Sequence, residues 1–309
     1  MTRRSPKDIV ASIHQRLLNV AKQTGRPFND LVMYFAIERF LYRLSQSRYG
    51  DRVILKGGLL LRVWDTPVTR VTRDIDLLAK LSNDPGQVRE VVRGVCDVVV
   101  EEDGLVFDAD TVTTARIAED ADYEGVRATF RGWFGKMPLA MQVDFGFSDV
   151  ITPAPVPIAY PSVLDHPPAR LLAYNRETSI AEKFEAMTKL GEINSRMRDF
   201  FDVWVLSQNF AFEGRVLADA IRSTFARRGT EVEAEPACFT DRFAHVPTKA
   251  AQWKAFVKTS RVGQAPAEFA EVVTRVREFL QPVARAVASR RPHESKWGPG
   301  GPWAAEVSD

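Results

Sequence analysis

The stretch LKGGLLLRVWDTPVTRVTRDIDLLAK, from Leu55 to Lys80, constrains the fold of this chain more than any other. An apolar run ends in Gly57 and Gly58, a short helical pattern follows, and a β-type segment then carries Asp74 and Asp76. Side chains alternate between the two faces of a strand, so both aspartates point to the same side. Aspartate is depleted in strands, and like charges side by side repel. The stretch therefore predicts an α/β core with a cation at the aspartate pair.

Size and composition indicate a globular protein of the cell interior. The 309 residues are 45% hydrophobic, which suits one large domain or two smaller ones. A formal net charge of +2 does not by itself indicate nucleic-acid binding. Cys96 and Cys238 lie far apart without metal-ligand spacing, which favours a reducing cytoplasm over a disulfide-linked secreted protein. We expect neither a membrane span nor a secretory signal, because no apolar run is long enough and none follows the basic N-terminus.

Four consecutive segments are expected along the chain. Residues 1–50 show apolar residues at helical spacing and should pack as helices on the core. Residues 51–160 should form a mixed α/β core, with a helix from Pro85 to Cys96 and three later stretches rich in β-branched and aromatic residues. After a proline-rich connection, residues 161–290 read as a helical domain that completes the active site, and 291–309 as a flexible tail with little to bury. The predicted fold class is α+β, a mixed β-sheet core with flanking helices and a C-terminal helical domain.

A third carboxylate fits the aspartate pair. In MQVDFGF, the alternation places Val143, Phe145 and Phe147 on one face of a strand and Asp144 on the other. If this strand neighbours the one with Asp74 and Asp76, three carboxylates converge. We expect them to bind Mg²⁺, with Mn²⁺ as an alternative ion, because such ions combine carboxylates with phosphate oxygens and water where nucleotides are handled.

The glycine turn has a compatible role. Gly57 and Gly58, between a strand and a helix, allow backbone N–H groups and the positive end of the helix to approach an anion. Lys56 either adds positive charge for a nucleotide or faces solvent. Alone, a Gly-Gly pair is usually just a turn, and an Asp-x-Asp pair is common on surfaces. Their order, followed by a third strand aspartate, is far more specific for phosphate and metal binding.

This combination resembles the nucleotidyltransferase superfamily that includes DNA polymerase β, in which a Gly-Gly or Gly-Ser turn precedes Asp-x-Asp and a further carboxylate lies on a later strand. Within it, LKGGLLLRVWDTPVTRVTRDIDLL is most similar to the AbiEii toxin family. SIAEKFEAM and RMRDFFDVWVL resemble that family's Ala-Glu-Lys helix and its Arg-x-Lys-Asp-x-x-Asp segment. Arg198 stands where the family usually has lysine, which preserves charge but not shape. The resemblance covers Val53 to Leu206.

The resemblance implies a toxin of type IV toxin–antitoxin or phage-defence systems, restrained by a cognate antitoxin protein. Some members, the MenT toxins, transfer nucleotides to the acceptor end of tRNA and stop aminoacylation. The family's functional positions would be Gly57 and Gly58 for the triphosphate, Asp74 and Asp76 for the metal, and Lys183 with Asp199 or Asp202 to complete the site.

Without the resemblance, the sequence supports a functional role for Lys183, Asp199 and Asp202 only in part. Lys183 lies beside the apolar stripe of a helix, so it either points inward or extends to solvent. Asp199 and Asp202 share a helix face, where they serve a site or form a surface salt bridge with Arg196 and Arg198. With the resemblance, we expect Lys183 to contact a phosphate or base. Which aspartate belongs to the site stays open.

The segment from Lys249 to Arg291 carries nine basic residues and three glutamates, with Trp253 and Phe256 among its lysines. Such clustering is typical either of an RNA-backbone footprint or of an ordinary solvated helix face.

We therefore expect a metal-dependent nucleotidyltransferase toxin that transfers a nucleoside monophosphate from an NTP to RNA, specifically the tRNA 3′ acceptor end, and so blocks translation. Asp144 would help activate the attacking hydroxyl, and Lys183 would offset developing charge. One alternative is transfer to a protein hydroxyl. Another is an NTP-binding module without catalysis. Neither the NTP nor the acceptor can be identified from the sequence.

Overall fold

The computed structural model describes residues 6–67, 70–120 and 123–305, and the chain divides into two compact units, each considered by itself. Unit 1 comprises Met1–Val63, Thr72–Ser148 and Pro157–Ala173, and unit 2 comprises Trp64–Val71, Asp149–Val156 and Tyr174–Asp309. The units are interleaved in sequence because the chain leaves the sheet of unit 1 and later returns to it. The expected division into four consecutive segments stays a prediction.

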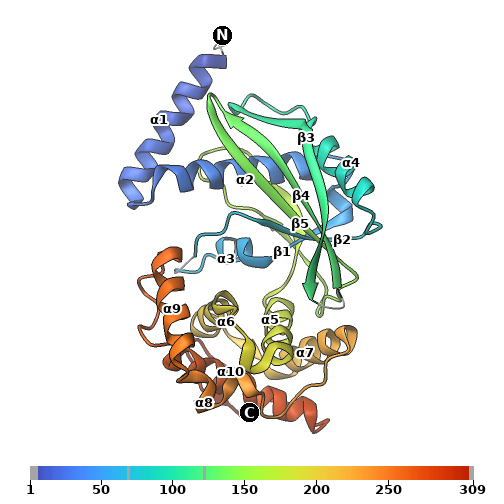
Figure 1. Cartoon of the computed structure of the whole chain (residues 1–309), viewed down its shortest axis with the longest axis vertical. Helices are drawn as coiled ribbons and strands as arrows, with labels where there is room; N and C mark the ends of the chain where they lie inside the picture. Colours follow the sequence, from blue (N-terminus) through green and yellow to red (C-terminus); the bar gives the residue numbers. More distant parts are fainter. Residues whose placement is uncertain (1–5, 68–69, 121–122, 306–309) are drawn as a thin grey trace. The chain divides into compact units, whose positions relative to one another are not determined.

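Unit 1 is built on a seven-stranded mixed sheet in the order β3-β4-β5-β2-β1-β7-β6 (Figure 1). The neighbours β1–β2, β3–β4 and β4–β5 are antiparallel, whereas β2–β5 and β1–β7 are parallel. The strands are β1 (Val53–Lys56), β2 (Ile75–Ala79), β3 (Leu105–Asp120), β4 (Tyr123–Phe134), β5 (Met137–Phe147), β6 (Val156–Ala159) and β7 (Arg170–Ala173). The three β-rich stretches of the sequence are therefore confirmed as β3, β4 and β5.

Helices α2 (Phe28–Gln46) and α4 (Pro85–Cys96) pack on this sheet. Unit 1 also contains α1 (Pro6–Thr24) and the single turn α3 (Leu60–Val63). Phe40 of α2 packs on Phe130 of β4 and Phe107 of β3, with ring centroids 5.1 and 5.6 Å apart. The helix expected from Pro85 to Cys96 has these bounds, and Asp84 caps it by accepting a hydrogen bond from the Gln87 N–H.

Unit 2 is mostly helical, as the sequence predicted for the second half of the chain. Its helices are α5 (Arg176–Leu190), α6 (Met197–Asn209), α7 (Gly214–Arg228), α8 (Asp241–Ala244), α9 (Pro247–Ser260) and α10 (Phe269–Ala288). Aromatic contacts form the core, such as Phe184 stacked on Phe239 at 5.6 Å and Phe200 edge-on to Phe269 at 5.1 Å. Pro282 lies inside α10 without ending it.

Residues 291–305, the described part of the segment expected to be a flexible tail, contain two short strands. The short strands β9 (Lys296–Trp297) and β10 (Trp303–Ala304) pair with each other, and β9 pairs with β8 (Phe212–Glu213). Trp297 is buried, packs on Phe279 and donates its indole N–H to the Ser207 carbonyl at 2.7 Å. The tail is fixed because its tryptophans supply the apolar area that breaker-rich sequence otherwise lacks.

The predicted α+β class is confirmed, although the short strands β6 and β7 were not predicted because they lie in or near the proline-rich connection. Across residues 6–67, 70–120 and 123–305, no helix combines the length and the apolar character that crossing a membrane requires.

Candidate active site

The glycine turn directly follows the buried strand β1. Lys56 ends the strand and is only 6% exposed, so it does not face solvent. Gly57 has φ +76°, a conformation that favours glycine. A Cβ at Gly57 would overlap the Asp76 carboxylate and come within 2.6 Å of its Cγ and 2.8 Å of its Cβ. Glycine is therefore required at position 57 both by the backbone angle and by the close approach of Asp76.

The helix after this turn is shorter than the sequence indicated. Gly57–Leu59 form a 3₁₀ turn, and α3 extends only from Leu60 to Val63. A single helical turn has few aligned peptide dipoles, so its N-terminus adds little positive potential. The expectation that a helix dipole contributes positive potential at this turn is therefore wrong. The positive charge at the turn comes from Lys56.

Four charged residues form a row across the middle of the sheet. In the strand registers, Lys56 is opposite Asp76, Asp76 is opposite Asp144, and Asp144 is opposite Arg127. Directly opposed residues point to the same face of a sheet. The predicted neighbourhood of the Asp76 and Asp144 strands is thus confirmed.

This row lies on the sheet face away from α2 and α4. On β5, Val143 and Phe145 are buried and pair with Ala128 and Val126 of β4. These residues share the face of Phe130, which packs on α2. Asp144 alternates with them and so occupies the opposite face, as the sequence predicted.

Asp144 is held by an arginine that the sequence reading missed. Arg127 of β4 donates from Nε and Nη2 to the two carboxylate oxygens of Asp144, each at 2.8 Å, and Gln142 donates to it at 3.1 Å. The hydrogen bond to Asp144 raises the pKa of Arg127, and the charges of Asp144, Asp74 and Asp76 act in the same direction. All three aspartates therefore lie within electrostatic reach of one guanidinium.

The carboxylates of Asp74, Asp76 and Asp144 do not form a complete metal site by themselves. They are better suited to a divalent ion that arrives bound to a nucleotide. Among the described residues, no group of three or more Asp, Glu, His or Cys side chains is arranged to hold a metal. Asp74 lies just before β2 and is half-buried, and Asp144 is bound to Arg127. Mg²⁺ needs only one or two carboxylates when phosphate oxygens and water complete its shell. The assignments of Asp74, Asp76 and Asp144 to metal stay predictions.

In unit 2, Lys183 of α5 bridges the two aspartates of α6. Its Nζ lies 3.0 Å from Asp199 Oδ1 and 2.8 Å from Asp202 Oδ2, and its side chain is 15% exposed. Arg70 donates to both oxygens of Asp202 at 2.8 and 3.0 Å, and Arg196 pairs with Asp199 at 2.8 Å. The alternative of a solvated Lys183 is therefore wrong. The alternative of salt bridges to Arg196 and Arg198 is confirmed for Asp199 with Arg196, whereas Asp202 pairs with Arg70 and Lys183.

Charge and burial oppose each other in this cluster. Burial disfavours the charged form of Lys183, but Asp202 and Asp199 outweigh it and raise the lysine pKa. Burial also disfavours ionised Asp202, but Arg70 and Lys183 outweigh it and lower the aspartate pKa. The cluster is thus a fully charged network in a low-dielectric environment, the kind of arrangement that occurs at functional sites and also in structural ion pairs.

Arg70 and Arg127 had no recognised role in the sequence. Arg127 could have been found from strand alternation, because it shares the polar face of β4 that pairs with the polar face of β5. Arg70 carried no such signal, since its partner Asp202 is 132 positions away.

A comparison with known families decides the identity of the chain. The family described as "Nucleotidyl transferase AbiEii toxin, Type IV TA system" matches residues 39–275. The chain belongs to the AbiEii family. The match extends beyond the resemblance seen in the sequence, from within α2 to within α10. An AbiEii protein is a nucleotidyltransferase toxin of a toxin–antitoxin system, so an NTP substrate and an antitoxin partner go with the family.

Three solved structures are similar to this chain at low sequence identity. A candidate nucleotidyltransferase from H. pylori shares 14% identity, with a TM-score of 0.49 over 87% of this chain and 100% of its own. MenT4, the nucleotidyltransferase toxin Rv2826c from Mycobacterium tuberculosis H37Rv, shares 16% identity, with a TM-score of 0.47 over 89% and 99% of the two chains. JHP933 from Helicobacter pylori shares 13%, with a TM-score of 0.45 over 82% and 88%. No curated protein sequence matches the chain.

Proposed function

We propose that this AbiEii protein transfers a nucleoside monophosphate from an NTP to RNA, at the 3′ acceptor end of tRNA, and thereby blocks translation in the cytoplasm. The observation that carries the proposal is the row of Lys56, Asp76 and Asp144 beside the Gly57 turn, in a chain of a nucleotidyltransferase family. A positive side chain, a glycine turn and paired carboxylates are what a nucleotide triphosphate with a divalent ion requires.

In the proposed site, Lys56, Gly57 and Gly58 bind the triphosphate, and Asp74 and Asp76 bind Mg²⁺ or Mn²⁺. When bound, the ion would neutralise phosphate charge and polarise the α-phosphate. The close packing of Gly57 on Asp76 supports this assignment, because it fixes the carboxylate directly beside the phosphate-binding turn. Such fixed positioning accounts for much of the catalysis of phosphoryl and nucleotidyl transfer.

The reaction is an in-line displacement. The acceptor hydroxyl oxygen forms a bond to the α-phosphorus, the bond from that phosphorus to the leaving pyrophosphate breaks, and Asp144 takes the hydroxyl proton. Both oxygens of Asp144 accept hydrogen bonds from Arg127, so proton transfer needs this pair to open. We propose that phosphate oxygens of the bound nucleotide compete for Arg127 and release Asp144.

In unit 2, Lys183 is proposed to contact a phosphate or the base of the nucleotide. Asp199 and Asp202 would orient its amine, which they already hold at 3.0 and 2.8 Å. Both aspartates touch the lysine, so the geometry supports a shared role rather than a choice between them.

The test uses each of the four α-³²P-labelled NTPs with purified tRNA and total cell protein, with Mg²⁺ or with chelator. We expect the label in tRNA, dependence on the ion, and a loss of roughly a thousandfold in Asp76→Ala, since several kcal/mol of charge stabilisation would be removed. Asp110→Ala is the matched control, because Asp110 is an exposed aspartate of the same unit. Full activity of Asp76→Ala would refute the metal assignment.

The same assay separates the alternatives. Label in protein instead of tRNA would show nucleotidylation of a protein hydroxyl. Absence of transfer to either acceptor, together with calorimetric NTP binding that needs no metal, would show a binding module without catalysis.

A further inference from the structure

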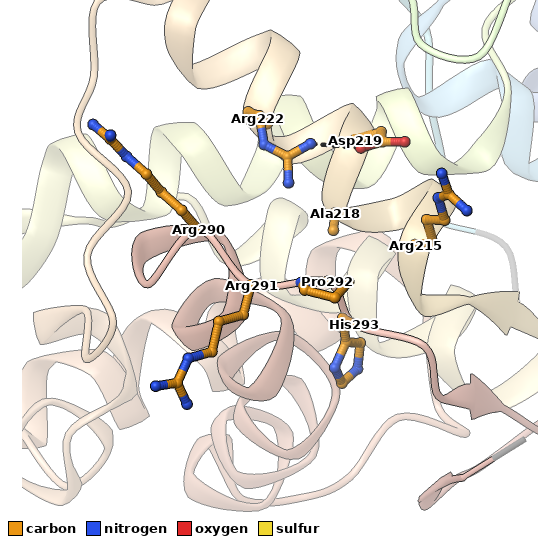
Figure 2. Close-up of a pocket in the computed structure, with 8 residues that line it drawn as sticks. All are labelled: Arg215, Ala218, Asp219, Arg222, Arg290, Arg291, Pro292 and His293. Carbon is orange, nitrogen blue, oxygen red and sulfur yellow. Dashed lines mark hydrogen bonds and ion pairs between the residues drawn. The ribbon is translucent and has the colours of Figure 1, made fainter.

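A pocket of about 220 Å³ in unit 2 gathers positive charge, and its lining includes none of Lys183, Asp199 and Asp202 (Figure 2). Its lining includes four arginines, one aspartate and one histidine, namely Arg215, Arg222, Arg290, Arg291, Asp219 and His293. Such local charge density is unusual in a chain whose formal net charge is only +2. The pocket therefore attracts anions strongly.

Two elements supply these side chains. On α7, Arg215, Asp219 and Arg222 are four and three residues apart and so share one helix face. Arg222 pairs with Asp219 at 2.5 Å, and both side chains stay about half exposed. In Figure 2, the segment that follows α10 lies opposite this face, and the guanidinium groups of Arg290 and Arg291 extend outward. Exposed arginines of this kind can rotate onto a ligand.

The turn after α10 fixes the second element. Arg290 N–H donates to the Val287 carbonyl at 3.0 Å, and Arg291 N–H donates to the Ala286 carbonyl at 2.8 Å. This is the pattern of a Schellman motif, whose left-handed position is normally glycine. Here Arg290 occupies it, with φ +53°.

Polar groups at the pocket lack partners within the protein. Among the described residues, no ion pair or side-chain hydrogen bond is formed by Arg215, Arg290 or Arg291. His293 Nε2 is buried and likewise has no hydrogen-bond partner in the described part of the chain. The ring is held in place, since it packs edge-on against Trp303 at 4.6 Å and a Cβ at Gly214 would collide with it. A buried polar atom without a protein partner is available to bind water or a ligand.

Helix stability does not explain this arrangement. Arg290 and Arg291 could favour the negative end of the α10 dipole. Arg215, however, is the second residue of α7, where a cation opposes the positive end of the dipole. Glycine would suit the backbone at position 290 better than arginine. Both residues are locally unfavourable, so they are better explained by a bound anion.

The structure also shows which basic residues of the segment from Lys249 to Arg291 already have partners within the protein. Lys249 is buried and donates to the Asn194 carbonyl. Arg277 pairs with Asp241 at 2.9 Å, and Arg285 pairs with Glu235 at 2.9 Å. These three basic side chains are bound within the protein, whereas Arg290 and Arg291 line the pocket together with residues of α7.

We propose that the pocket binds a backbone phosphate of an RNA chain. Guanidinium groups bind phosphate oxygens in pairs, and His293 can donate one further hydrogen bond. The other lining residues, Ala218 and Pro292, are not aromatic, and the His293 ring already packs against Trp303, so the contact reads the backbone and not the sequence. That the polyanion is RNA rests on the proposed function.

The test measures the affinity of a fluorescein-labelled oligouridylate by anisotropy across a salt series, in chelator and without NTP. The pocket variant Arg215→Gln/Arg290→Gly removes one guanidinium from each element. Glycine at position 290 suits its backbone, so weaker binding cannot be assigned to unfolding, and the thermal midpoint verifies this. The matched control is Arg227→Gln/Arg261→Gly, which removes one arginine of α7 and one arginine from the left-handed C-cap of α9.

We expect the pocket variant to bind at least about tenfold more weakly at low salt, with the slope of log affinity against log salt reduced by about 1 to 1.5. The control should keep the wild-type slope. Equal loss in both variants, or no loss in the pocket variant, would overturn the proposal. If polyglutamate competes as effectively as unlabelled oligouridylate, the pocket is an acidic-peptide site and the proposal is overturned. If low inorganic phosphate displaces the RNA, the pocket is a free-anion site and the proposal is likewise overturned.

Because this experiment contains neither NTP nor divalent ion, it is read independently of transfer. If the pocket variant binds RNA as well as the wild type, the labelled-NTP result is unaffected. If no nucleotide transfer is detected, the RNA affinity can still be measured.

Discussion

Replacing Gly57 by alanine tests how tightly the phosphate-binding turn and Asp76 constrain each other. The backbone at this position has φ +76°, which costs an alanine about 1–2 kcal/mol. The added methyl group would also meet Asp76, whose Cγ and Cβ would lie 2.6 and 2.8 Å away. Rotation of the aspartate side chain moves Cγ but not Cβ, so the backbone of β1 or β2 must shift as well. Overpacking of this kind costs about 1–3 kcal/mol.

We therefore expect Gly57→Ala to lower the free energy of unfolding by about 2–4 kcal/mol, measured by urea denaturation followed by circular dichroism. Gly25→Ala is the matched control. Gly25 lies in the same unit with φ +67°, but a Cβ there meets no atom within 4 Å. It isolates the backbone cost, which we expect to be about 1 kcal/mol after the smaller entropy of the unfolded alanine chain is included.

The collision itself is measured by a double-mutant cycle. Asp76→Ala removes Cγ and the carboxylate oxygens, so Gly57→Ala should cost at least about 1 kcal/mol less in that background. In the transfer assay, displacement of Asp76 by 1 Å should lower activity on the order of a hundredfold in Gly57→Ala but not in Gly25→Ala. Equal stabilities of the two glycine variants, with no coupling in the cycle, would refute the close approach as a constraint.

Two further predictions concern buried charges. Lys183→Met should lower the free energy of unfolding by about 3 kcal/mol. Burial raises the pKa of Asp202, but Arg70 and, next to it, Lys183 outweigh burial and keep this pKa below its ordinary value. The stability that the lysine supports through Asp202 is therefore present above that ordinary value and is lost as pH falls, so the variant should unfold at higher pH in an acid titration. The exposed Lys254→Met should change neither. Burial raises the pKa of Glu38 to about 7, so the contribution of Glu38 to native stability should decrease by roughly 3 kcal/mol as pH rises from about 4.5 to 7. Denaturation at both pH values should show that Glu38→Gln removes this dependence and that the exposed Glu90→Gln retains it. An unchanged slope in Glu38→Gln would contradict the assigned burial effect.

Much of the fold followed from the sequence because its signals are local. Apolar spacing located α1, α2 and most helices of unit 2, and the helix expected from Pro85 to Cys96 is α4. β-branched and aromatic runs located β3, β4 and β5. The errors arose where local signals are weak. β7 is only four residues long, and Trp297 and Trp303 are fixed by packing against Phe279, a contact between segments far apart in the chain.

The same distinction applies to the candidate sites. By itself, the sequence determined that Asp74, Asp76 and Asp144 occur in strand context near a glycine turn, because alternation and turn chemistry depend on neighbouring residues. Strand pairing decided that Asp76 lies beside Asp144 and that Arg127 holds the latter. Helix packing decided that Lys183 bridges Asp199 and Asp202, and chain reversal after α10 brought Arg290 opposite Arg215. These ion pairs and pockets join residues distant in sequence, and Coulomb forces and burial act on distance in space, which only the tertiary structure sets.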